Sequence, residues 1–270
     1  MTEPLSRRRF IAITAAAAGA APTAALADAL RRRPGEATRW RGVALGAEAE
    51  ITLIGPRGEA EAALAAARAE IDRMMAEFNL YDPASSLGRL NDTSRLDAPS
   101  PVFHALCDAV DDLHTATDGL FDPTVQRLWN DPDAQTDAGW TDVARSDDRI
   151  DLRPGLALTF NGIAQGFATD QVSALLAEHG FPKSLVNIGE IRGSGGPWTI
   201  GLADPKAGMV GTRTITDGAV ATSSPGAMTL AGGIAHIVHP REPERAPLWS
   251  TVSARLVPGI SNRPPSSSIP

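Results

Sequence analysis

Segments with helical periodicity lie mainly in the first half of this sequence, and segments that alternate like strands lie mainly in the second. One apolar stripe at helical spacing runs through 58–79: Leu64, Ala67, Ile71, Met74 and Phe78. A doubly wound α/β chain alternates strands and helices, so this segregation argues against that fold. The sequence therefore predicts an α+β fold with a mostly antiparallel β core.

Two further helices are expected, over 100–119 and over about 165–179. Ser100 can cap the start of the first helix, and Pro101 suits its first turn. Glycines can end both helices: Gly119 and Gly180. Strand patterns occupy 46–54, 184–189, 198–203, 212–216, 219–223, 235–239 and 250–256. The acidic, turn-rich residues 130–155 are expected to form a surface excursion.

The N-terminus has the pattern of an export signal. The stretch "SRRRF" is followed by a short apolar run and the small-x-small sequence of Ala25 to Ala27. Paired arginines before Phe10 predict a twin-arginine signal peptide over 1–27 and hence a periplasmic location. The apolar run is too short and too poor in large residues to stay as a permanent membrane span. We expect a linker over 28–41, one domain over 42–257 and a Pro/Ser-rich, disordered tail over 258–270.

Charge and motifs exclude several classes of function. The formal net charge is −7, and basic residues cluster only at the N-terminus, which argues against nucleic acid as a partner. His236 and His239 are three apart on a predicted strand, so their side chains should face opposite sides. Zinc-site, nucleophile-elbow, Walker and dinucleotide-fingerprint motifs do not occur. The single Cys107, among apolar neighbours, is expected to be buried and rules out an internal disulfide.

Four polar, glycine-rich stretches are flanked by core-like segments. They are 78–91, 117–129, 159–170, and 221–226 taken together with 235–240. Each stretch alone has two interpretations. It is a turn, or it is a place where a backbone without side chains approaches a ligand, as Gly162 and Gly166 on either side of Gln165 would allow.

In order and spacing, these stretches resemble the ApbE family of FAD:protein FMN transferases over roughly residues 42–257. The similar segments are "GVALGA", "FNLYDPASSLGRLN", "TDGLFDPTVQRLW", "NGIAQGFATD", "SLVNIGE", "AVATSSPG" and "HIVHPRE". The form "NGIAQG" with "VNIGEIR" is particularly similar to NosX-like members, which are exported accessory proteins of nitrous-oxide reductase systems. The resemblance implies the ApbE-like single-domain fold.

The resemblance also implies an activity. Members of the family cleave FAD with Mg²⁺, attach the FMN half to a Thr or Ser hydroxyl of a partner flavoprotein, and release AMP. It implies that His236 helps to activate the acceptor hydroxyl and that the backbone carbonyl of Gly162 binds the metal. It places FAD contacts at Leu45, Tyr81, Leu120, Phe121, Asp122, Thr159 and Gln165.

The chain departs from the family pattern at several positions. Thr159 stands where members usually have Asp, Gln165 stands where they have Lys or Glu, and "VNIGE" lacks the usual second glycine. Members also carry an Asp and a Thr near the C-terminus that bind Mg²⁺, whereas no acidic residue follows Glu244 here. We therefore hypothesise a truncated or altered tail. Two alternatives to the transferase follow: a non-catalytic FAD-binding maturation factor, and an FAD pyrophosphatase in which water replaces the protein hydroxyl.

Magnesium binding tests the hypothesis on the tail. Mg²⁺ held by backbone oxygens without a carboxylate should bind weakly, so calorimetric titration is expected to show no saturable binding to the protein alone below about 1 mM. Saturable binding at clearly lower concentration would contradict the hypothesis. Ca²⁺, titrated in the same way, serves as the comparison ion.

Overall fold

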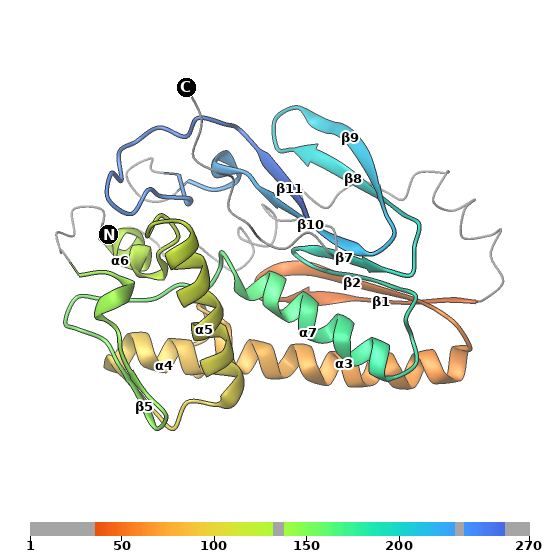
Figure 1. Cartoon of the computed structure of the whole chain (residues 1–270), viewed down its shortest axis with the longest axis horizontal. Coiled ribbons are helices and arrows are strands. Elements are labelled where there is room, and N and C mark those ends of the chain that lie inside the picture. The colour runs from red at the N-terminus through yellow and green to blue at the C-terminus, as the bar shows by residue number, and fades with distance from the viewer. Residues whose placement is uncertain (1–35, 132–137, 230–234, 257–270) are drawn as a thin grey trace.

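The computed structural model describes residues 36–131, 138–229 and 235–256. Its largest sheet is antiparallel, with strand order β1-β2-β6-β7-β10-β11 (Figure 1). The strands span Ala37–Ala44, Ala47–Ile54, Ser184–Ile188, Ile191–Ser194, Gly218–Ser223 and Val252–Leu256. The tight β1–β2 turn consists of Leu45 and Gly46, both at positive φ (47° and 80°). This turn matters because it borders the candidate site.

Two long helices cover one face of this sheet, α3 (Arg57–Phe78) and α7 (Ala164–Glu178) (Figure 1). Their apolar faces join Ile51 and Leu53 of β2 and Val186 of β6 in the main hydrophobic core. All five residues of the predicted stripe in 58–79 are buried in α3. Apolar burial of this kind is the main force that holds a helix onto a sheet.

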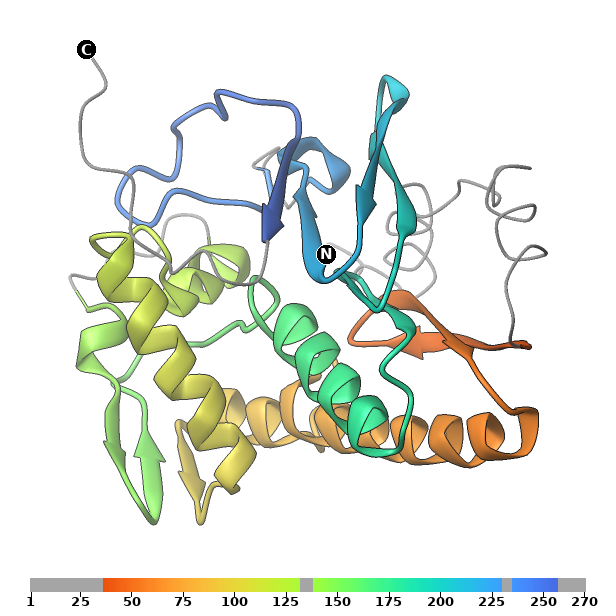
Figure 2. The same ribbon diagram turned by 45° about the vertical axis from the view of Figure 1, so that its right-hand side comes forward.

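A two-stranded hairpin packs on the opposite side of the sheet from the helices (Figure 2). It consists of β8 (Trp198–Asp204) and β9 (Gly208–Ile215). Trp198, Ile200 and Ile215 form a smaller core with Val220 of β10. The middle of the large sheet is therefore covered on both faces, whereas the edge strand β11 is exposed along its length.

The remaining elements lie beside the α3 and α7 layer (Figure 1). They are α4 (Ser86–Thr93), α5 (Pro101–Ala116), α6 (Gln126–Asn130), the short 3-10 helices η1 (Pro123–Val125) and η2 (Trp140–Asp142), and a small sheet of β3 (Arg95–Asp97), β4 (Ala144–Ser146) and β5 (Arg149–Asp151). A third 3-10 helix, η3 (Pro225–Ala227), instead follows directly after β10. The rings of Phe78, Phe103 and Phe160 join this part to α3, with centroids 5.6 to 6.0 Å apart. Phe167 of α7 adds an edge contact to Phe78.

The α+β fold class and the antiparallel core are confirmed. The hydroxyl of Ser100 accepts from Phe103 N at the start of α5, and Gly180 follows α7 at φ +85°, as predicted. Cys107 is buried, and burial raises the pKa of its thiol to about 11.

Three expectations are wrong. Residues 37–41, assigned to a linker, belong to β1, where cross-strand hydrogen bonds to β2 outweigh their charged composition. The stretch 130–155 is not simply a surface excursion, since Trp140, Val143 and Ile150 are buried in the main core. Residues 235–239 are not a strand, and only one isolated bridge, Thr229 to Ala235, occurs there. The predicted signal peptide 1–27 and tail 258–270 lie outside the described residues.

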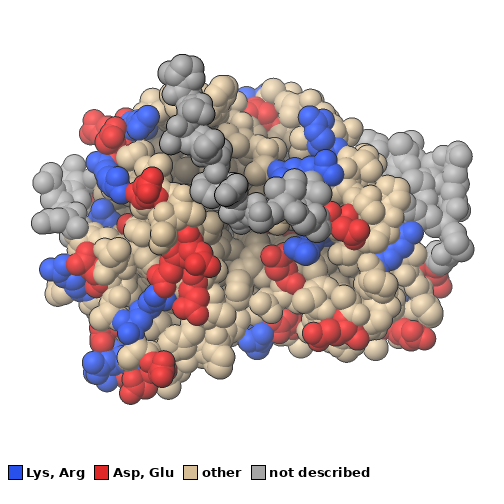
Figure 3. Space-filling view, in the orientation of Figure 1, with Lys and Arg blue, Asp and Glu red and all other residues tan. Residues whose placement is uncertain are grey.

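The face in Figure 3 carries acidic and basic side chains interspersed. Acidic side chains gather over α5, where Arg145 pairs with Asp111. None of the helices in the described part of the chain combines the length and the apolar character needed to cross a membrane.

The aromatic cluster is expected to carry much of the stability of this part. Phe103→Ala removes a fully buried ring, and should lower the free energy of unfolding by about 3–5 kcal/mol. Leu113→Ala, on the exposed side of the same helix, is the control and should change it by less than about 1 kcal/mol. Equilibrium urea unfolding measures both, and equal effects would contradict the role of the cluster.

Candidate functional site

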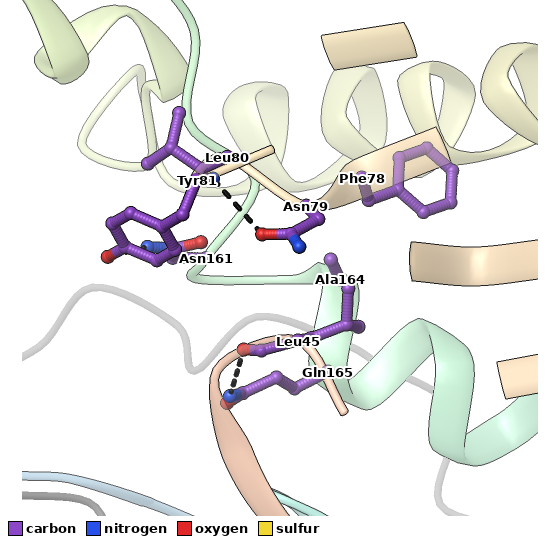
Figure 4. Close-up of a pocket in the computed structure, with 8 residues that line it drawn as sticks. All are labelled: Leu45, Phe78, Asn79, Leu80, Tyr81, Asn161, Ala164 and Gln165. Carbon is purple, nitrogen blue, oxygen red and sulfur yellow. Dashed lines mark hydrogen bonds between the residues drawn. The ribbon is translucent and has the colours of Figure 1, made fainter. Parts of the chain in front are cut away.

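A pocket opens where the β1–β2 turn, the C-terminal end of α3 and the N-terminal end of α7 meet (Figure 4). It is lined by Leu45, Phe78, Asn79, Leu80, Tyr81, Asn161, Ala164 and Gln165. Three of the predicted FAD contacts, Leu45, Tyr81 and Gln165, therefore lie in one pocket although they are distant in sequence. The pocket combines apolar walls with amide and phenol groups, as small-molecule sites usually do.

Gln165 is fixed between two backbone segments. Its Nε2 donates to the carbonyl of Leu45 at 3.3 Å (Figure 4). On its other side lies Gly189, at φ +86°, where an added Cβ would be 2.5 Å from Gln165 Cδ. Glycine at 189 thus satisfies both the backbone conformation and the close approach of the amide.

Tyr81 stands at the mouth of the pocket between two asparagines. Its backbone N–H donates to Asn79 Oδ1 at 3.0 Å, and Asn161 Nδ2 donates to its hydroxyl oxygen at 3.4 Å (Figure 4). Partial burial raises the pKa of Tyr81, and the hydrogen bond from Asn161 opposes this shift. The phenol is therefore neutral at physiological pH and can donate a hydrogen bond.

Hydrogen bonds from distant segments hold the backbone before α7. The side chain of Asn91 donates to Leu158 O at 2.8 Å and accepts from Leu158 N at 2.7 Å. The buried Thr159 donates its N–H to Pro123 O at 2.9 Å, and its hydroxyl accepts from Asn161 N at 3.2 Å. The stretch 159–170 is therefore tied to both 78–91 and 117–129.

The predicted residues of 117–129 lie next to this backbone. A Cβ on Gly162 would lie 3.1 Å from the Phe121 ring, so this close approach favours glycine. The carboxylate of Asp122 is turned inward, toward Thr124 and the N–H of Trp140. Leu120 is exposed.

His236 lies outside the set of residues that lines the pocket. Its ring meets the Trp129 ring edge-on, with centroids 6.4 Å apart, and its Nδ1 is 3.2 Å from Met228 O. A carbonyl can only accept, so Nδ1 is the donor in this contact. The backbone carbonyl of Pro225 is a second partner of the ring. Burial lowers the pKa of His236, and its backbone carbonyl partners oppose this shift.

Gly162 is the residue whose carbonyl the family resemblance assigns to magnesium. Across 36–131, 138–229 and 235–256, no cluster of three or more His, Cys, Asp or Glu side chains could hold a metal ion. Mg²⁺ prefers one or two carboxylates beside water and phosphate oxygens. The described residues therefore do not form a protein-built magnesium site.

Glu190 is a partly buried titratable residue that the sequence did not single out, and it lies next in sequence to Gly189. It follows Gly189 in the β6–β7 turn, and its carbonyl accepts from Thr169 Oγ1 of α7 at 3.3 Å. The backbone N–H of Thr222 faces its carboxyl group, but Oε2 is buried without a partner. Burial raises the pKa of Glu190 to about 7. The only sequence signal was the Glu in place of the second glycine of "VNIGG".

Asn79 and Asn161 were also missed. Both precede residues that favour turns or sites, Asn79 before Leu80-Tyr81 and Asn161 before Gly162, and the sequence alone explains such asparagines as turn residues. The contact of Asn161 with Tyr81, across a separation of 80 residues, becomes visible only in the fold.

Solved structures of flavin transferases share this architecture. The flavin transferase ApbE from Vibrio cholerae is 22% identical, with a TM-score of 0.68 and a match over 82% of each chain. The ApbE protein from Thermotoga maritima is 25% identical, with a TM-score of 0.67 and a match over 81% of each chain. The chain thus has the fold of the flavin transferase class.

The family follows from the sequence match. A model of the ApbE family matches residues 45–254, and the chain belongs to this family. A curated relative, the FAD:protein FMN transferase of Klebsiella pneumoniae (strain 342), is 36% identical over 74 residues, which are 26% of this chain. That match spans 23% of the length of the relative. The narrower resemblance to NosX-like members stays a prediction.

The raised pKa of Glu190 gives a pH-dependent stability. The ordinary pKa of a glutamate is 4.5, and that of Glu190 in the folded chain is about 7. At a pH between these two values, the unfolded chain has lost the proton of Glu190 and the folded chain retains it. The free energy of unfolding therefore falls as pH rises through this window. Glu190→Gln cannot ionise and should be more stable than the wild type by about 1–3 kcal/mol above the window, with little difference below it. Urea unfolding across the window measures this.

Glu48→Gln, on the exposed side of β2, is the matched control. Glu48→Gln should leave the pH dependence of the free energy of unfolding unchanged. If Glu190→Gln also leaves it unchanged, the carboxyl group of Glu190 is not desolvated in the folded protein.

Proposed function

We propose that this protein transfers the FMN moiety of FAD to a hydroxyl group of a partner protein. One observation carries the proposal: the pocket of this ApbE family member brings together Leu45, Tyr81 and Gln165 from three separate segments. The Vibrio cholerae protein named above is a flavin transferase, and the curated relative is named for FAD and a protein acceptor. The acceptor residue is proposed to be Thr or Ser, and the leaving group AMP.

The side chains around the pocket offer contacts that suit parts of a flavin dinucleotide. Tyr81 offers an exposed aromatic ring and a phenol donor, and the Gln165 amide offers both a donor and an acceptor. At Gly166 a side chain would meet no atom within 4 Å, so the backbone there is open to phosphate oxygens. Leu120, Asp122 and Thr159 complete the proposed set of FAD contacts.

The transfer exchanges the phosphoanhydride bond of FAD for a phosphoester bond to the acceptor. The acceptor oxygen forms a bond to the FMN phosphorus, the bond from that phosphorus to the AMP oxygen breaks, and AMP leaves with the electron pair. His236 is proposed to take the proton of the acceptor hydroxyl. Its lowered pKa keeps the imidazole neutral near pH 7, as a general base requires.

Mg²⁺ dependence and export are further parts of the proposal. Mg²⁺ would neutralise charge on the diphosphate, with the Gly162 carbonyl as the one protein ligand that the resemblance supplies. The described residues add no carboxylate cluster to it, and this observation favours a second candidate function, FAD binding without turnover in the maturation of another protein. The arginine pair near the N-terminus supports export to the periplasm by the twin-arginine route.

One incubation separates the candidate functions. The full chain is mixed with FAD, Mg²⁺ and a Thr-bearing acceptor peptide, and the products are identified by mass spectrometry. Flavin covalently bound to the peptide together with AMP is the expected result, and EDTA should abolish it. Free FMN would instead indicate a pyrophosphatase, and tight FAD binding without turnover would indicate a maturation factor.

The variant His236→Ala sharpens this test. Loss of a general base should slow transfer by roughly 10²- to 10⁴-fold while FAD affinity changes little. His104→Ala, whose ring bonds Asp147 O on the surface, is the control. Unchanged transfer by His236→Ala would remove this residue from the mechanism.

A further inference from the structure

Arg127 of α6 is a buried arginine without an acidic partner among the described residues. It is 8% exposed, and the ion pairs of the described chain do not include it. Its Nε has no hydrogen-bond partner, and its hydrogen bonds to described residues come from Nη1. A buried charge normally requires compensation, so the position calls for an explanation.

Two oxygens of Thr124 accept hydrogen bonds from the Arg127 guanidinium group, and one of them, the hydroxyl, links it to a carboxylate. Nη1 donates to Thr124 O at 3.0 Å and to Thr124 Oγ1 at 2.8 Å. A guanidinium group has no acceptor, so the Thr124 oxygen must accept this bond and its own proton is free to point elsewhere. That proton goes to Asp122 Oδ1, 2.6 Å from Thr124 Oγ1. Thr124 is fully buried, which keeps water from competing.

These contacts fix the orientation of the Asp122 carboxylate. Oδ1 accepts from both the hydroxyl and, at 2.8 Å, the backbone N–H of Thr124. Oδ2 faces Trp140 N–H at 3.3 Å, and a Cβ on Gly139 would be only 2.9 Å from it. The carboxylate is therefore confined from several sides, and the strongest of these restraints depends on Thr124.

We propose that Arg127 is a positioning residue for Asp122, acting through the hydroxyl of Thr124 to hold the carboxylate in the orientation that FAD requires. This inference rests on the proposed function, in which Asp122 contacts FAD. The positive charge is two hydrogen bonds away from the carboxylate, so it polarises the hydroxyl and strengthens the bond that the hydroxyl donates. Arg127 itself need not touch the dinucleotide.

A double-mutant cycle tests this route. FAD affinity is measured by fluorescence titration for the wild type, Arg127→Met, Asp122→Asn and the double variant. Arg127→Met should weaken FAD binding by about tenfold or more. In the Asp122→Asn background the same change should have little further effect, because its route to the ligand is already lost. Equal effects of Arg127→Met in both backgrounds would overturn the proposal.

Thr124 supplies a second test that does not depend on removal of a buried charge. Thr124→Val preserves the shape and removes the hydroxyl, so it should weaken FAD binding by a factor similar to that of Arg127→Met. Thr124→Ser retains the hydroxyl and should bind within about threefold of the wild type. A purely structural role would lower the melting temperature of both Thr124 variants without separating their FAD affinities, and that result would overturn the proposal.

The surface arginine Arg95, paired with Asp97, provides the control variant Arg95→Met. This variant should bind FAD as the wild type does. Failure of the wild type to bind FAD would refute the proposed function together with this inference. Normal binding by the wild type and by both Arg127→Met and Thr124→Val would refute the inference alone.

Discussion

The packing of α3 and α7 on one face of the antiparallel sheet is the interaction on which the candidate site depends. The pocket lies at the corner where the end of α3, the start of α7 and the β1–β2 turn meet. Each of these segments is placed by buried apolar residues, such as Met74 of α3, Val172 of α7 and Ile51 of β2. Apolar burial is not directional, so it brings the segments together without orienting their polar groups.

Orientation comes from a small number of directional contacts across the core. Asn91 holds Leu158 by paired hydrogen bonds, and the buried ring of Phe160 follows in the aromatic cluster. The chain then turns into α7 with Gln165 held between Leu45 O and Gly189. The polar contacts act only because the core has already excluded water from them.

Few charged or titratable groups are singled out around the site, and each of them is restricted by hydrogen bonds or by burial. Asp122 and Arg127 share one threonine hydroxyl, Glu190 is desolvated beside α7, and His236 is kept neutral by burial. Such an arrangement suits a reaction in which the substrate carries more charge than the side chains around it. Polar groups of the protein that are already oriented need not reorganise when this substrate binds. The proposed FMN transfer from FAD is a reaction of this kind.

The sequence by itself determined the helices over 57–78, 101–116 and 164–178, most of the strands, the α+β class and the resemblance to the ApbE family, because periodicity and motif order are local properties of the chain. It did not determine β1, whose charged residues form a strand only by pairing with β2, or that 235–239 would not be a strand. Likewise, only the tertiary structure placed Leu45, Tyr81 and Gln165 in one pocket and left His236 beside Trp129. The environments of Glu190 and Arg127 were also decided there, because burial and hydrogen-bond partners arise from segments far apart in the chain.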